Sequence, residues 1–189
     1  SPIMVPTAVL VPDGVNFVQV TTGLNRACAL DSTGNAWCWG HNYNGTFGDG
    51  TYTSNSSPQR VLLPAGTSLS SISTGWYHTC GLTTTGTLLC WGTNDNGELG
   101  TVTTLGGKTI RQTVLPDGVV AASVSAGLGQ TCMLTTTHEA WCWGVNYFGS
   151  LGQGTLVGSK LPVKILAVGT PTVASPVASS VGAEQATVG

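Results

Sequence analysis

The stretch GWYHTCGLTTTGTLLCWGTNDNGELG, residues 75–100, decides the fold of this chain because the sequence contains it three times. The other copies read GLNRACALDSTGNAWCWGHNYNGTFG at residues 23–48 and GLGQTCMLTTTHEAWCWGVNYFGSLG at residues 127–152. Successive copies begin 52 residues apart, with no insertion or deletion between them. A fixed period near 50 residues indicates stacked or radially arranged units, because no single unit can bury its own apolar face.

Each repeat is expected to supply four short β-strands. In the first repeat these are residues 17–21, 27–30, 36–39 and, after a long loop, 59–63. The segments are rich in β-branched or aromatic residues, lie between turn residues and show no helical period. Four strands in a 50-residue unit are typical of a β-propeller blade, whereas the alternative, a stacked β-solenoid, usually repeats at shorter intervals. The sequence therefore predicts an all-β fold of three propeller blades.

The six cysteines indicate three disulfide-closed hairpins. Each pair flanks a four-residue turn, so its two cysteines should lie directly opposite each other on neighbouring strands. Each bridge closes a short loop and should contribute about 2.5–3 kcal/mol in the loop-entropy model. Zinc ligation would need closer cysteine spacing or nearby histidines, and free buried thiols are the remaining alternative. Disulfides imply an oxidising compartment. The expected pairs are Cys28–Cys38, Cys80–Cys90 and Cys132–Cys142.

Composition excludes several classes of partner. Charged residues are 7% of the chain against about 25% in average proteins, and the net charge is −2. No cluster of Lys and Arg is present, so we expect no nucleic-acid partner and no attraction to an anionic membrane. The apolar runs are too short to span a bilayer. A surface of Thr, Ser, Asn and Gly, in a chain that begins at Ser1, favours a processed protein that is extracellular or at the cell surface.

The recurring pattern Gly-x4-Cys-x-Leu-x3-Gly-x3-Cys-Trp-Gly-x-Asn-x2-Gly-x-Leu-Gly resembles the RCC1 (regulator of chromosome condensation) repeat. The resemblance covers about residues 14–166. It implies a β-propeller, usually of seven blades, and the cysteine-paired form looks like that of secreted bacterial and archaeal proteins. A seven-blade ring would need nearly twice the present length, so we expect an incomplete propeller that other chains complete. The nucleotide-exchange activity of the founding member depends on features outside the repeat and is not carried over.

The ends of the chain suggest how such completion would occur. Residues 1–14 form an N-terminal strand, in which Met4–Val11 repeats the pattern of a blade's last strand; residues 15–167 are the three repeats, and residues 168–189 an extended tail of linker-like composition. Three blades leave two uncovered faces, an exposed apolar surface. We expect one head-to-tail contact between chains to cover these faces and to bury the two extended ends. The residues expected at this interface are Val5, Val9, Leu10, Val173, Val177 and Val181.

No catalytic centre, metal site or cofactor is expected. The histidines (His41, His78 and His138) fall at unmatched positions of the repeat, and no nucleophile motif is present. Residues 94–98 resemble a calcium loop only in part, because the alternating carboxylates are absent. The segment containing Trp76 resembles a Gly-Trp-Arg-His-Thr motif of light-sensing family members, but Tyr77 replaces the arginine, so we expect a structural tryptophan rather than a chromophore.

The function predicted from the sequence is that of a non-enzymatic extracellular structural subunit that self-assembles into a filament, tube or surface layer. Its partners would be other copies of itself, joined by strand or tail exchange. The alternative is a protein- or glycan-binding adhesin module of a larger surface protein. The tryptophans beside the second cysteine of each pair favour packing between blades, with an exposed sugar platform as the alternative. Asn44 and Asn55 have the form of N-glycosylation acceptors.

Overall fold

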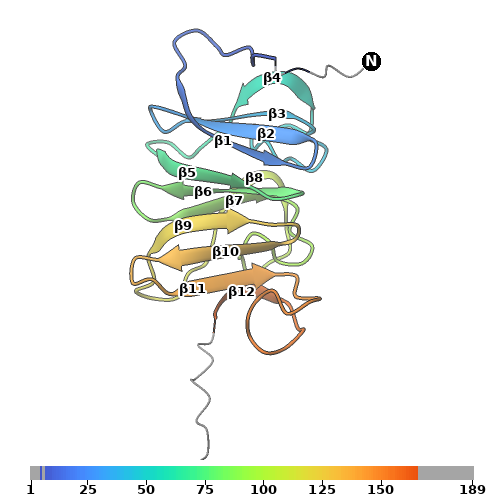
Figure 1. Ribbon diagram of the computed structural model, residues 1–189, viewed down its shortest axis with the longest axis vertical. Helices are drawn as coiled ribbons and strands as arrows, with labels where there is room; N and C mark the ends of the chain where they lie inside the picture. Colours follow the sequence, from blue (N-terminus) through green and yellow to red (C-terminus); the bar gives the residue numbers. More distant parts are fainter. Residues whose placement is uncertain (1–4, 6, 166–189) are drawn as a thin grey trace, which may run out of the picture.

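The computed structural model describes Val5 and residues 7–165 of the 189-residue chain. These residues form twelve β-strands and no helix, arranged as three antiparallel sheets of four consecutive strands (Figure 1). Each sheet corresponds to one repeat and is called a blade below. The prediction of an all-β fold with three propeller blades is confirmed, and the propeller that these residues form is not closed.

The blades follow one another along the chain. Blade 1 consists of β1 (Phe17–Gly23), β2 (Arg26–Asp31), β3 (Ala36–Gly40) and β4 (Asn55–Arg60). Blade 2 consists of β5 (Leu69–Thr74), β6 (His78–Thr83), β7 (Leu88–Gly92) and β8 (Gly107–Gln112). Blade 3 consists of β9 (Ala121–Ala126), β10 (Gln130–Thr135), β11 (Ala140–Gly144) and β12 (Ser159–Lys164).

The first strands of the blades bring the sheets together. Strand β5 contacts both β1 and β9, so blade 2 lies between its two neighbours (Figure 1). Both faces of blade 2 are therefore covered. Blade 1 and blade 3 each leave one face without a neighbouring blade among the described residues. We call the uncovered face of blade 1 the front face and the uncovered face of blade 3 the back face.

Disulfides close the central hairpin of every blade. In each hairpin the two cysteines are direct register partners, as the spacing predicts. The bonds are Cys28–Cys38, Cys80–Cys90 and Cys132–Cys142, each with Cα atoms 4.1 Å apart. The turns need one residue with positive φ, which Gly34 (83°) and Gly86 (82°) provide at no steric cost. His138 adopts the same conformation at 64°, as expected for a residue that substitutes for glycine there.

The fourth strand of the repeat differs from the prediction. It spans Asn55–Arg60 rather than residues 59–63. Val61 still donates its backbone N–H to Ala36 O of β3 and its side chain enters the core, and Leu62 then donates its backbone N–H to Gly48 O in the long loop. A register shift between Cys38 and Gly40 lets Asn55 pair with Gly40. The predicted bounds were wrong because this is an edge strand, whose polar residues face solvent and show no apolar alternation.

The N-terminal segment forms no strand in its described part. Residues 7–12 are irregular, and Val5, Val9 and Leu10 are exposed in the single chain. The predicted strand at Met4–Val11 has no partner strand among the described residues. Its burial against a second chain, like the division of the chain into three parts, stays a prediction.

Candidate interaction surfaces

Each joint between two blades is an apolar interface built around one tryptophan. Between blades 1 and 2, the fully buried Trp91 packs in one cluster with blade 1 residues that include Leu30, Phe47 and Val61. Between blades 2 and 3, Trp143 packs with Leu82 and Leu88 of blade 2 and with residues of its own blade. Packing between blades, rather than a sugar platform, is therefore the role of these two tryptophans.

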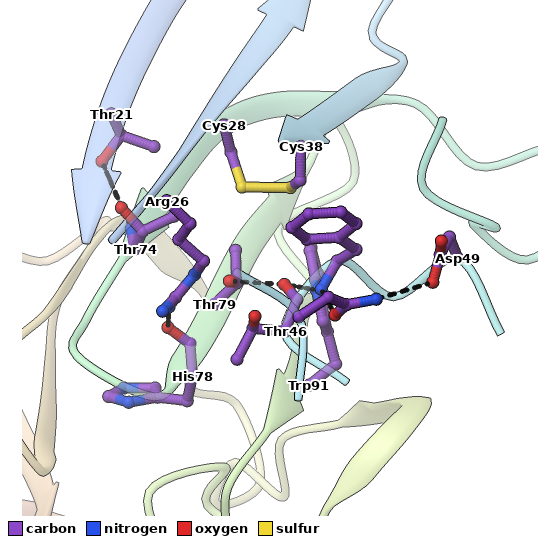
Figure 2. Close-up of a disulfide and its surroundings, with 12 residues drawn as sticks. Thr21, Arg26, Cys28, Cys38, Thr46, Asp49, Thr74, His78, Thr79 and Trp91 are labelled. Atoms are coloured by element: carbon purple, nitrogen blue, oxygen red, sulfur yellow. Dashed lines mark hydrogen bonds between the residues drawn. A yellow bond between two sulfur atoms is a disulfide. The ribbon is translucent and has the colours of Figure 1, made fainter. Parts of the chain in front are cut away.

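The same tryptophans make a hydrogen bond that repeats at both joints. The Trp91 indole N–H donates to the Thr46 carbonyl oxygen at 2.8 Å, and the Thr79 hydroxyl donates to the same oxygen at 3.0 Å (Figure 2). The Trp143 indole N–H and the Thr131 hydroxyl both donate to the Glu98 carbonyl oxygen, each at 2.8 Å. Because these groups are buried, each satisfied carbonyl also fixes how one blade sits on the next.

A second polar contact repeats near the first strands. The backbone N–H of Thr74 donates to the Thr21 hydroxyl at 3.3 Å, and that of Ala126 donates to the Ser73 hydroxyl at 2.9 Å. The hydroxyls of Thr21 and Thr74 also lie 3.1 Å apart (Figure 2). A hydroxyl of one blade thus bonds to the first strand of the next blade at both joints.

Glycines let the backbones of neighbouring blades meet. A Cβ placed on Gly23 would lie 2.3 Å from Gly75 O, and one placed on Gly75 would lie 2.2 Å from Gly127 O. Neither distance is compatible with a side chain, so no other residue fits these two positions without movement of the backbone. At Gly127 a Cβ would meet only its own blade, chiefly the flexible side chain of Gln130.

Two basic side chains sit inside these joints, and only one of them is charged at neutral pH. The Arg26 guanidinium donates to Gly75 O and to His78 O at 2.9 and 2.6 Å, and burial lowers its pKa to about 10. His78 Nε2 lies 2.8 Å from the Thr131 hydroxyl. Burial and the nearby Arg26 charge lower the pKa of His78 to about 3, so this histidine is neutral and structural at physiological pH.

The back face of blade 3 exposes positions that the joints bury. Leu134 is 47% exposed, whereas Leu82, at the same position of blade 2, is 5% exposed. Around Leu134 lies an open hollow of about 340 Å³. Its apolar lining includes Val124, Met133, Leu134, Ala140 and Ile165. Ser150, which matches Thr46 and Glu98, is exposed, and its carbonyl oxygen accepts no hydrogen bond from the described residues.

The front face of blade 1 carries the opposite half of a joint. Phe17 stacks on Trp39 with ring centroids 6.1 Å apart and meets Trp37 edge-on at 6.5 Å. Within the described residues the Trp39 indole nitrogen donates no hydrogen bond, although its counterparts Trp91 and Trp143 each donate one. Val20 is 65% exposed, while Ile72, at the same position of blade 2, is 2% exposed.

The front-face aromatics are held in place from within their own blade. Trp37 donates its indole N–H to the Asp31 carboxylate at 2.9 Å. Burial acts to raise the pKa of Asp31, but hydrogen bonds from Trp37, Thr33 and Asn35 together lower it to about 2. The carboxylate is therefore ionised at neutral pH and anchors the ring of Trp37 before any partner binds.

The turns considered as metal or active-site candidates serve the backbone. Asn94 accepts from Leu99 N at 2.9 Å and donates to Thr103 O, and Asn42 and Asn146 make matching bonds in their own blades. Among the described residues no three His, Cys, Asp or Glu side chains gather as a metal site would require, and no helix long and apolar enough to cross a membrane is present. Trp76 meets Tyr77 edge-on, and its carbonyl accepts from Arg26.

The interface residues predicted from the sequence are only partly placed. Val5, Val9 and Leu10 are exposed, and Val173, Val177 and Val181 lie outside the described residues. The sequence predicted two uncovered faces but not the residues that form them, which include Phe17, Trp39, Leu134 and Ser150. The available signal was the repeat itself, because aligning each position with its buried counterpart one repeat away identifies them.

The comparisons with known proteins agree on one family. Models of the regulator of chromosome condensation (RCC1) repeat match residues 17–46, 69–98 and 121–150, and residues 33–82, which together are more than half of the chain. The chain is 27% identical over 168 residues to the ultraviolet-B receptor UVR8 of Arabidopsis thaliana, a match that covers 86% of this chain and 37% of the receptor. It is 30% identical over 154 residues to the human E3 ubiquitin-protein ligase HERC2, covering 80% of this chain and 3% of the ligase.

A solved structure supports the same fold. Yeast RCC1 (Prp20), in its complex with Kap60, matches with a TM-score of 0.69 at 23% identity, covering 82% of this chain and 38% of that one. The chain thus spans less than two fifths of the relatives named here. The likeness shows the fold, and the recurring sequence pattern is confirmed as the repeat of this family. The chain therefore belongs to the RCC1 repeat family and forms three β-propeller blades, each closed by a disulfide.

Proposed function

We propose that this chain is a non-enzymatic structural subunit that assembles with other copies of itself outside the cell. The assembly would be a filament, tube or surface layer in which blades of successive copies cover one another. The function lies in the two end faces of the blade stack, with the N-terminal segment and the tail as further contacts.

One observation carries this proposal: matched positions are buried inside the chain and exposed at its two faces. Leu134 and Val20 are large apolar side chains whose counterparts Leu82 and Ile72 are almost fully buried. Exposed apolar surface of this kind marks interaction sites in soluble proteins. The front and back faces are therefore the surfaces best suited to a partner.

The polar side chains and the disulfides support a structural role in an oxidising compartment. The polar groups that recur in every repeat, such as Asn42, Asn94 and Asn146, are occupied by hydrogen bonds within turns. His78, whose pKa is lowered to about 3 by burial and by the Arg26 charge, is enclosed in a joint rather than open to a substrate. Three disulfides favour an extracellular compartment.

Sedimentation velocity over a dilution series, with electron microscopy of the same samples, tests self-assembly. We expect oligomers or polymers that dissociate on dilution and survive high salt, because the faces are apolar and carry little charge. A deletion of residues 168–189 tests the tail: the shortened chain should stay soluble and form smaller particles. A full-length chain that sediments as a monomer at high concentration would contradict the proposal.

A second candidate function, that of a binding module, is favoured by the long loops between the third and fourth strands. These loops expose aromatic side chains at one end of the blades: Phe148 is 96% exposed, and Tyr43 and Tyr147 are also exposed. Aromatic residues with a polar tip suit protein or glycan ligands. A monomeric protein that binds a glycan array, and loses binding when Tyr43 and Tyr147 become alanine, would favour this alternative.

A further inference from the structure

We propose that the front face of one copy packs on the back face of the next in the same register as blade 3 packs on blade 2. The occupant of the back face is thus blade 1 of a second copy of this chain. This inference rests on the proposed self-assembly and specifies its geometry. It follows from the two internal joints, which show what covers a face of this type.

The hydrogen bond that each tryptophan makes across an internal joint has a free donor on the front face and a free acceptor on the back face, within the described residues. At each internal joint an indole N–H donates to a carbonyl oxygen 45 positions earlier in the chain. On the front face Trp39 holds the unused donor, and on the back face the carbonyl of Ser150 is the unused acceptor. Bringing the faces together completes the bond a third time.

The hydroxyl contact gives the same pairing independently. Thr21 and Ser73 accept from the backbone N–H of Thr74 and Ala126, residues 53 positions later. The next hydroxyl in the series is that of Ser125 on the back face. Its matching amide belongs to Thr22 on the front face, one repeat before Thr74. Both side chains are exposed in the described chain.

The apolar surfaces also correspond. Trp143 covers Leu82 and Leu88 in the internal joint, and the matching back-face residues are Leu134 and Ala140. Trp39 of the next copy takes the position of Trp143 against them. Blade 1 departs from the pattern at Ala27, which stands where Thr79 and Thr131 have a hydroxyl, so the joint between copies has one hydrogen bond fewer.

The backbone contact of the glycines continues the series. Gly23 approaches Gly75 O and Gly75 approaches Gly127 O, so Gly127 is left to approach Gly23 O of the next copy. The joint has a donor side and an acceptor side, which makes it heterologous. Such a contact closes into a ring or extends as a fibre, depending on the rotation between copies.

Mixing two variants of the full chain, each with one added cysteine beside the three native disulfides, tests this geometry. Thr22→Cys and Ser125→Cys replace groups whose internal counterparts, the Thr21 and Thr74 hydroxyls, are 3.1 Å apart. Under mild oxidation the mixture should form a disulfide dimer that each variant alone does not form. Thr103→Cys, exposed in the long loop of blade 2, mixed with Ser125→Cys is the matched control and should not cross-link.

A third variant sharpens the test. Gly127→Ala, added to the Ser125→Cys chain, places a methyl group on the back face, where it would meet Gly23 O of the next copy. The yield of the mixed dimer should then fall about tenfold or more. The chain itself should stay folded, which circular dichroism checks, because within the chain the methyl group meets mainly the Gln130 side chain.

The outcomes separate this inference from the function on which it rests. Cross-linking in the mixture alone supports the head-to-tail joint. Cross-linking of either variant with itself, or oligomers by sedimentation without the mixed dimer, overturns the joint and leaves self-assembly standing. Monomers in both experiments overturn both proposals, and the faces are then covered by something other than a second copy.

Discussion

The joint between blades 2 and 3 and the back face of blade 3 use the same positions of the repeat in opposite surroundings. In the joint, Leu82 is buried and the Glu98 carbonyl accepts two hydrogen bonds. On the back face, Leu134 is exposed and the Ser150 carbonyl accepts none from the described residues. The comparison teaches that burial in this protein is decided by the neighbouring blade and not by the repeat itself, as in other repeat architectures.

The front face extends the same lesson to the aromatic residues. Trp39 and Trp91 follow the second cysteine of their hairpins and have the same local structure. Trp91 is fully buried and hydrogen-bonded to Thr46 O, whereas Trp39 is half-buried and stacks on Phe17. The same local sequence therefore contributes differently to the free energy of unfolding in different blades, and mutations at matched positions can measure the difference.

The largest expected difference is between the two tryptophans. Trp91→Ala should lower the free energy of unfolding by about 3–5 kcal/mol, because it empties a buried site and removes a hydrogen bond between blades. Trp39→Ala should lower it by about 1 kcal/mol, since the ring is only partly covered. Chemical denaturation at the lowest measurable concentration compares them, and equal losses would break the contrast between joint and face.

The glycines give the next largest difference. Gly75→Ala should cost about 1–3 kcal/mol of stability, because its methyl group meets the backbone of blade 3 at Gly127 O. Gly127→Ala should change stability by less than about 0.5 kcal/mol, since only a mobile side chain must move. Neither glycine has a positive φ, so alanine fits the backbone at both positions; at Gly75 the methyl group also meets the His78 ring of its own blade, which adds to the cost. Thermal unfolding of the two variants side by side provides the measurement, and a Gly127→Ala loss as large as that of Gly75→Ala would contradict it.

The smallest expected effect is the pH dependence that His78 adds to a joint. Its pKa falls from 6.5 to about 3 on folding, so above pH 6.5 the residue is neutral in both states and has no effect. As the pH falls through 6.5 the unfolded chain binds a proton that the folded chain does not, and stability falls by about 1 kcal/mol between pH 6.5 and 5.5. Denaturation at pH 6.5 and pH 5.5 measures this loss.

His78→Gln is the matched control for that experiment. Glutamine already stands at the same position of blade 3 as Gln130, and it can bond the Thr131 hydroxyl without titrating. The variant should lose this part of the slope between pH 6.5 and 5.5. If its slope equals that of the unchanged chain, the pH dependence comes from another group.

The regular interior of each blade could be predicted from the sequence because its signals are local. Cysteine spacing and the turn between the cysteines place Cys80 opposite Cys90, and the turn glycine predicts where the chain reverses. The fourth strand could not be placed as well, because Asn55–Arg60 is an edge strand with polar residues towards solvent. Local alternation carries no information where one side of a strand has no partner.

The sequence by itself determined the number of blades, their first three strands and their disulfides, because the 52-residue period recurs along the chain and each hairpin pattern lies in neighbouring residues. Only the tertiary structure decided which tryptophan is fully buried and which is half-buried, and which backbone carbonyls accept a hydrogen bond from the next blade. The physical reason is that a blade has two faces and that the residues of the blade itself cover neither, so each face is buried only where another blade lies on it. Burial of Leu82 or exposure of Leu134 depends on a surface contributed from a different repeat, about 50 residues away, and no local pattern encodes whether that surface is present.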